Sequence, residues 1–134
     1  MEIKFRAWDD EAKAYFLDWD RVPRMYPVVA IDFQLRTMEL KLPDDYEDRD
    51  TINLDDCVLM QFTGLKDRNG IEIYEGDCFA WGIHRCEVVW DKDGFGARNQ
   101  QGQIFSLHTI FPMGEIIGNI YEKPELLTSR VDRQ

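Results

Sequence analysis

The stretch of sequence that decides the fold of this chain runs from Gln61 to Asp77 and reads QFTGLKDRNGIEIYEGD. It contains three glycines, an Asn-Gly step at Asn69-Gly70 and a Gly-Asp step that begins at Gly76, all set between short apolar runs. Glycine adopts positive φ freely, Asn tolerates the left-handed conformation, and both steps are typical of tight turns. The stretch therefore predicts three strands joined by two turns.

Short runs of apolar or β-branched residues, many of them alternating with polar ones, continue on both sides of this stretch and predict further strands. We expect strands at residues 3–8, 15–19, 28–33, 38–42, 58–62, 78–81, 84–90, 95–98, 104–107 and 115–121. Residues 34–37 are expected to close a hairpin, and residues 53–56 and 124–127 to form single helical turns, the second with Pro124 in its first position. Many short strands with regular turns are typical of an all-β barrel or sandwich.

The run from Ile73 to Phe79 resembles the turn that opens a small SH3-like barrel, where a Gly-Asp pair stands between apolar residues. We therefore expect a mainly β fold, an SH3-like partly open barrel with additional N-terminal strands and a short C-terminal helical turn. The 134 residues are expected to form one domain, because a chain of this length supports a single core. Its expected parts are N-terminal strands at 1–43, an acidic loop at 44–56, a barrel core at 57–127 and a polar tail at 128–134.

The charge of the chain is strongly negative, with a net value of −10 and a pI of about 4.6. Residues 44–56 hold seven carboxylates against Arg49 alone. This balance disfavours direct binding to nucleic acid and favours either solubility or a basic partner. No apolar run approaches the roughly 20 residues of a membrane helix, and the first residues alternate charged with apolar side chains, so we expect a cytoplasmic protein. Four tryptophans in a small chain also suggest self-association.

No arrangement of residues points to catalysis, and we expect no catalytic residue, metal or cofactor. The three cysteines have no CxxC spacing, and His84 with Cys86 supplies only two of the four ligands that zinc needs. The pattern Asp91-x-Asp93-Gly94 matches only the start of a calcium loop. The pattern of turns and aromatic residues instead favours binding, with Asn69, Tyr74, Asp77, Trp81 and Trp90 as the candidate residues. The alternative for the aromatic residues is a place in the core or at a subunit interface.

Three ordered motifs give the chain a family resemblance. They are residues 3–9, the stretch at 61–77, and residues 115–127, and together they span nearly the whole chain. The chain closely resembles the YopX family of phage and prophage proteins. The resemblance implies a mainly β protein with an SH3-like element, encoded by a temperate phage or prophage. It implies no established biochemical function and no known catalytic residues.

Three hypotheses for the function follow. The first is a non-enzymatic binding or adaptor module that acts on a protein partner or on a second copy of itself. The second is an acidic DNA mimic, in which the carboxylates of residues 44–56 imitate phosphates and occupy a DNA-binding host protein. The third is a small metal-dependent hydrolase that uses Asp77, Asp91 and Asp93.

Overall fold

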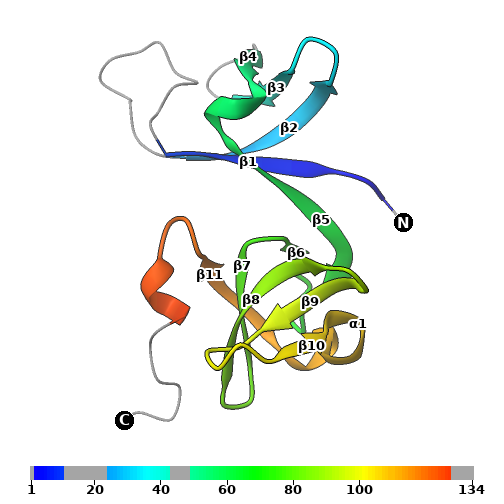
Figure 1. The fold of residues 1–134 in the computed structure, drawn as a ribbon, viewed down its shortest axis with the longest axis vertical. Coiled ribbons are helices and arrows are strands. Elements are labelled where there is room, and N and C mark those ends of the chain that lie inside the picture. Colours follow the sequence, from blue (N-terminus) through cyan, green and yellow to red (C-terminus); the bar gives the residue numbers. More distant parts are fainter. Residues whose placement is uncertain (1, 11–23, 43–48, 128–134) are drawn as a thin grey trace. The chain divides into compact units, whose positions relative to one another are not determined.

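The computed structural model of the chain describes residues 2–10, 24–42 and 49–127, and these residues are mainly β (Figure 1). The strands are β1 Phe5–Asp9, β2 Arg24–Asp32, β3 Thr37–Lys41, β4 Arg49–Asn53, β5 Val58–Lys66, β6 Glu72–Tyr74, β7 Asp77–Trp81, β8 His84–Asp91, β9 Gly94–Arg98, β10 Ile104–Ser106 and β11 Glu115–Asn119. The helical segments are η2 Leu54–Asp56, α1 Leu107–Ile110, η3 Phe111–Met113 and η4 Pro124–Leu127. The expected strand at 15–19 and the expected tail at 128–134 lie outside the described residues. In the described ranges no helix is long and apolar enough to cross a membrane.

The contacts within the chain divide it into two compact units. One unit comprises residues 3–61 and the other residues 62–134 together with the first two residues. The boundary falls between Gln61 and Phe62, inside β5, whereas the sequence places the start of the barrel at residue 57. Each unit has its own hydrophobic cluster.

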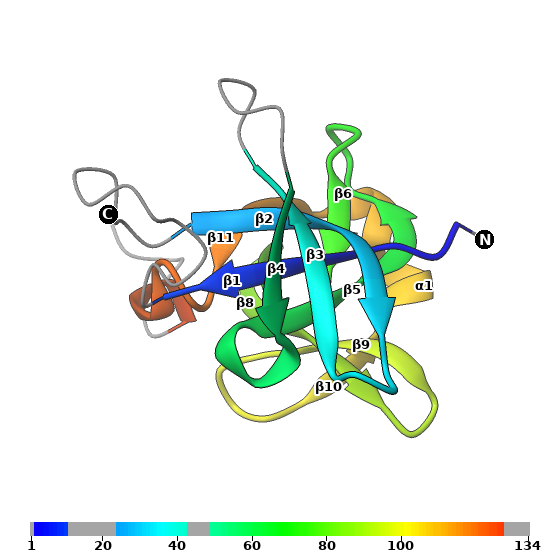
Figure 2. The same cartoon turned by 90° about the horizontal axis from the view of Figure 1, so that it is seen from above.

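The strands of the N-terminal unit form an antiparallel sheet in the order β4-β3-β2-β1-β5 (Figure 2). The part of β5 that belongs to the C-terminal unit pairs with β6. Its buried cluster contains Tyr26, Met38, Leu40 and Ile52, which come from three neighbouring strands. The prediction of a loop at residues 44–56 is wrong for residues 49–53, which form β4. Residues 43–48 lie outside the described residues. Ile52 pairs with Met38 across the sheet, so a period-two pattern buries it. The many carboxylates of residues 44–56 obscured this alternation of buried and exposed positions in the sequence.

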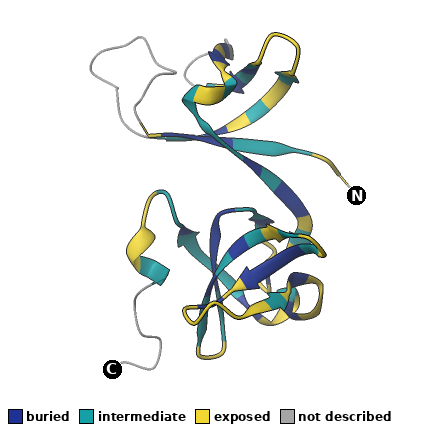
Figure 3. Ribbon diagram, in the orientation of Figure 1, coloured by how far each residue is buried: buried dark blue, intermediate teal, exposed yellow. Residues whose placement is uncertain are grey.

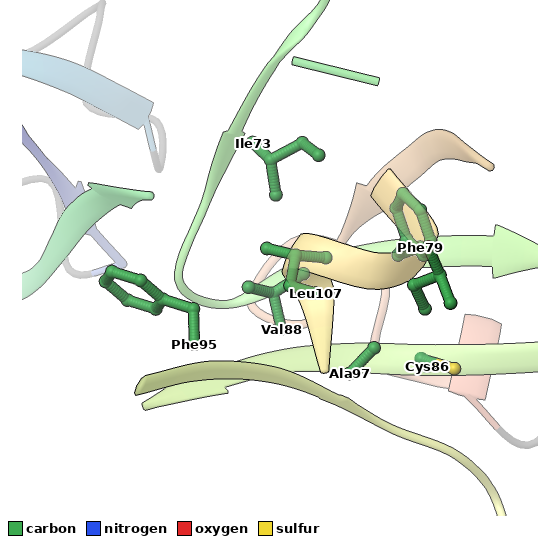
Figure 4. Close-up of a cluster of buried hydrophobic side chains, with 8 residues drawn as sticks. Ile73, Phe79, Cys86, Val88, Phe95, Ala97 and Leu107 are labelled. Carbon is green, nitrogen blue, oxygen red and sulfur yellow. The ribbon is translucent and has the colours of Figure 1, made fainter. Parts of the chain in front are cut away.

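The C-terminal unit is a sheet with the strand order β10-β9-β8-β7-β11. Its core contains Phe79, Val88 and Ala97 from the sheet, covered by Ile73 of β6 and Leu107 of α1 (Figure 4). The buried residues concentrate on the central strands and the exposed ones on the turns (Figure 3). The mainly β prediction is therefore confirmed. The SH3-like barrel is compatible with this arrangement and stays a prediction.

Buried Asp and Asn side chains hold the turns of the C-terminal unit in place. The carboxylate of Asp77 accepts the backbone N–H of Tyr74 at 2.7 Å, and Asn119 accepts the N–H groups of Tyr121 and Glu122 at 3.0 and 2.9 Å. Such side chains satisfy the backbone donors that a turn leaves unpaired inside the protein. The turn chemistry predicted at Gly76-Asp77 is thus present, with Gly76 at φ +89°.

The carboxylate of Asp67 joins two parts of the chain that are far apart in the sequence. Its Oδ1 accepts the N–H groups of Asn69 at 2.8 Å and Ile71 at 2.9 Å, which shapes the turn between β5 and β6. Its Oδ2 accepts the N–H of Ile116 in β11 at 2.7 Å. Of the Asn-Gly pair, only Gly70 takes positive φ, at +81°, so the left-handed conformation expected to suit Asn69 is not used there.

Candidate functional site

Three aromatic rings meet at one end of the C-terminal sheet, at the turn between β7 and β8. Trp81 and His84 pair directly across this turn, and their rings stack with centroids 5.2 Å apart. Phe105 of β10 completes the cluster, with its centroid 5.0 Å from each of the other two. All three residues are half-buried, and Trp81 and Phe105 pack against the hydrophobic core of the unit. We call this end of the sheet, defined by Trp81, His84 and Phe105, the aromatic end.

A buried amide, Asn99, fixes the chemistry of the histidine in this cluster. Its Oδ1 accepts the backbone N–H groups of Gln101 at 3.1 Å and Gln103 at 2.9 Å, so the oxygen and nitrogen of the amide are assigned by the hydrogen bonds. Its Nδ2 lies 3.2 Å from Nδ1 of His84 and 2.9 Å from Oε1 of Gln103. Because an amide nitrogen only donates, Nδ1 of neutral His84 accepts, and the ring proton is on Nε2. The aromatic end therefore offers one ring donor, Nε2–H, beside the stacked rings.

The turn between β5 and β6 lies at this same end of the unit. Arg68 donates its backbone N–H to the carbonyl of Gly114 at 3.0 Å, and Glu115 pairs with Ala80, the residue before Trp81. The guanidinium of Arg68 and the amide of Asn69 both reach Oε1 of Glu115, at 2.9 and 3.3 Å. The sequence-predicted residue Asn69 therefore has a partner at the edge of the aromatic end.

Exposed apolar side chains also lie in or beside the turns at this end of the unit. Ile83, in the turn between β7 and β8, is 71% exposed. Ile71 follows the turn between β5 and β6, Met113 precedes Gly114, and each is about half exposed. Apolar groups around half-buried rings, with polar donors among them, are the composition expected of a protein-binding surface.

The structure divides the five predicted binding residues between the two ends of the C-terminal unit. Asn69 and Trp81 lie at the aromatic end. Tyr74 and Asp77 belong to the turn at the opposite end, where Tyr74 packs on Phe62 with centroids 5.4 Å apart. Trp90 is also at that opposite end, 61% exposed and in edge contact with Phe95 at 4.7 Å. Trp90 is six positions along β8 from His84, a distance of roughly 20 Å, so the five residues do not form one site.

Three of the groups that the sequence offered for chemistry, Asp77, Asp91 and Cys86, are hydrogen-bonded or buried within the fold. The carboxylate of Asp77 is bonded to a turn amide, and that of Asp91 accepts the N–H of Lys92 at 2.6 Å. Burial raises the pKa of the Cys86 thiol to about 11, which keeps it protonated at neutral pH. Across the described ranges, no group of three His, Cys, Asp or Glu residues is placed to hold a metal ion.

The described part of the acidic run, residues 49–56, is also used within the fold. Asp50 is buried in the N-terminal sheet, and burial raises the pKa of its carboxyl, with the nearby Asp9 adding to the effect. Asp55 forms an ion pair with Arg36 at 2.8 Å. These two carboxylates are therefore not displayed as a row of free surface charges.

Sequence reasoning missed His84, Asn99 and Phe105 as parts of one cluster. A two-residue hairpin at Gly82-Ile83 makes Trp81 and His84 neighbours, and this signal is readable from the sequence. The contribution of Asn99 and Phe105 depends on the pairing of β8 with β9 and of β9 with β10, which no local pattern specifies.

Comparisons with known proteins agree with the fold and name no activity. A crystal structure described as protein EF1440 from Enterococcus faecalis is similar to the chain with a TM-score of 0.59 and 24% identity, over 95% of this chain and 99% of that one. The search of curated proteins finds no match. The family model described as YopX protein matches residues 4–128, nearly the whole chain. On that match, the chain belongs to the YopX family.

Proposed function

We propose that the protein is a non-enzymatic binding module that contacts a protein partner through its aromatic end. The observation that carries the proposal is the packed trio of Trp81, His84 and Phe105, bordered by the exposed Ile83. Aromatic residues at the centre of an interface supply much of its binding energy when a partner excludes water from them. The Nε2–H of His84 gives the surface a directional donor that a partner carbonyl or carboxylate can accept.

The charges of the described residues favour a protein over a nucleic acid. Binding to nucleic acid depends on cations that neutralise phosphates. Three arginines are instead paired with carboxylates of this chain: Arg36 with Asp55, Arg68 with Glu115 and Arg98 with Glu87, at 2.8, 2.9 and 3.0 Å. The net charge of −10 adds repulsion from phosphates. A protein partner, or a second copy of the chain, fits the aromatic end better.

The test compares two exposed apolar residues at opposite ends of the C-terminal unit. Ile83→Ser changes the aromatic end and Trp90→Ser changes the other end, and neither side chain is buried. Light scattering during size exclusion, over a range of concentrations, measures self-association. Affinity capture from a bacterial lysate identifies a protein partner, whose binding is then measured by calorimetry with purified components.

We expect Ile83→Ser to weaken the binding or the self-association about tenfold or more, and Trp90→Ser to leave it unchanged. A wild-type protein that stays monomeric and binds no purified candidate at micromolar concentration would count against a binding module. Loss of binding with Trp90→Ser alone would move the surface to the opposite end and overturn the assignment of the aromatic end.

A further inference from the structure

A second surface, in the N-terminal unit, is formed by the hairpin that joins β2 to β3. Phe33 and Leu35 occupy its turn and are 73% and 71% exposed, while Val29 in β2 is also exposed. Beside the turn is an open hollow of about 340 Å³. Its apolar lining includes Ile31, Phe33 and Met38. This volume is at the lower end of the range for ligand pockets and suits one or two side chains of a partner.

The turn is held in one conformation by its own contacts. The Oδ1 of Asp32 accepts the N–H groups of Gln34 at 3.0 Å and Leu35 at 2.9 Å. Arg36 takes a left-handed conformation at φ 56°, which is uncommon for a residue with a Cβ. Its carbonyl accepts the N–H of Leu54 at 2.9 Å, which ties the turn to η2. An exposed apolar turn that is already ordered loses little entropy when it binds.

The charge around the hollow selects the kind of partner. Asp32 and Glu39 line it together with the apolar residues, so carboxylates border the apolar surface. Two copies of this surface would bring like charges together, and an anionic membrane would be repelled. A Lys or Arg side chain matches both the apolar surface and the carboxylates, because its aliphatic stem packs on apolar groups while its charged head reaches a carboxylate.

We propose that the β2–β3 hairpin is a docking surface for a basic segment of a partner protein. A Lys or Arg stem lies in the hollow against Phe33 and Ile31, with its charged head near Asp32 and Glu39. An apolar neighbour on the partner packs against Leu35. The proposal is independent of the aromatic end, which belongs to the other unit and has different chemistry.

The test uses short fluorescent peptides of alternating Lys and Leu or Arg and Leu, with control peptides in which Glu replaces the basic residue. Anisotropy measures binding to the full chain, and amide chemical shifts locate it. Phe33→Ser removes the apolar side of the surface and Glu39→Gln weakens the acidic side. Ile3→Ser is the matched control, because Ile3 is equally exposed in the same unit but does not line the hollow.

We expect the basic peptides to bind, the shift changes to centre on residues 29–39, and Phe33→Ser to lower the affinity about tenfold. Glu39→Gln should lower it less and reduce its dependence on salt, and Ile3→Ser should not change it. The net charge alone attracts basic peptides, so equal binding by wild type and Phe33→Ser overturns the proposal. Absence of peptide binding, binding of the Glu peptides, or binding to vesicles of phosphatidylcholine and phosphatidylglycerol instead of the peptides also overturns it.

Discussion

Replacing Asp67 by Asn tests the physical reasoning about the stretch that decides the fold. The side chain of Asp67 is buried, with 5% of the residue exposed, and its two oxygens accept three backbone N–H groups. Asn has almost the same shape but only one oxygen. If that oxygen keeps the bonds to Asn69 and Ile71, the NH₂ group faces the N–H of Ile116, and two donors meet. If the amide flips, the two turn donors lose their acceptor.

The magnitude follows from these contacts. Leaving one buried N–H without an acceptor costs about 1–3 kcal/mol, and bonds to an ionised carboxylate lie at the upper end of the usual range. We therefore expect Asp67→Asn to lower the free energy of unfolding by about 2–3 kcal/mol. For a chain of this size that lowers Tm by roughly 6–15 °C.

Urea and thermal unfolding measure the loss, and hydrogen exchange at the amide of Ile116 reports the broken contact directly. The matched control is Asp32→Asn, because Asp32 is exposed and a single oxygen accepts both of its turn donors. Its cost should be a few tenths of a kcal/mol, as is usual for surface substitutions. If Asp67→Asn is as stable as Asp32→Asn, or if exchange at Ile116 is unchanged, the carboxylate does not join the two segments as described.

Three further predictions concern packing, pH and thiol chemistry. Gly114→Ala should destabilise the fold by about 2–3 kcal/mol in urea unfolding, because the added Cβ would clash with the buried ring of Phe79 and with the backbone carbonyl oxygen of Ala80. Burial raises the pKa of Asp50 in the folded protein, so its ionisation at neutral pH lowers the free energy of unfolding. Asp50→Asn should therefore raise stability at neutral pH. Unfolding measured as a function of pH should show this gain fading as the pH falls toward 3.8, the ordinary pKa of Asp. The Cys78 thiol, whose pKa is raised to about 11 by burial, should react with a disulfide reagent at pH 8 only after unfolding, whereas the half-buried Cys57 should react first.

Each of these three predictions can be contradicted by a specific result. Gly102→Ala is the control for Gly114→Ala, since Gly102 has open space around it and only its φ of +86° is strained, at a cost of about 1 kcal/mol. Equal losses in the two variants would mean that the ring of Phe79 moves aside without penalty. A pH-independent effect of Asp50→Asn, or immediate labelling of Cys78 in the native protein, would contradict the burial of those groups.

The chain's own sequence determined much of its secondary structure, because local patterns carry that information. Strand alternation and turn residues predicted the hairpin between β2 and β3, the turns at Gly70 and Gly76, and the helical turns η2 and η4. Each of these depends on a few consecutive residues. The family resemblance, carried by three motifs along the chain, is confirmed by the match to residues 4–128.

Only the tertiary structure decided where side chains from different strands meet. The division into two units inside β5, the joining of Asp67 to Ile116, and the cluster of Trp81 with Phe105 all require strand pairing over long distances in the sequence. Pairing of this kind depends on which faces are buried and which backbone donors remain to be satisfied, and these are properties of the assembled sheet. For the same reason the predicted binding residues, close in the sequence, lie at opposite ends of the C-terminal unit.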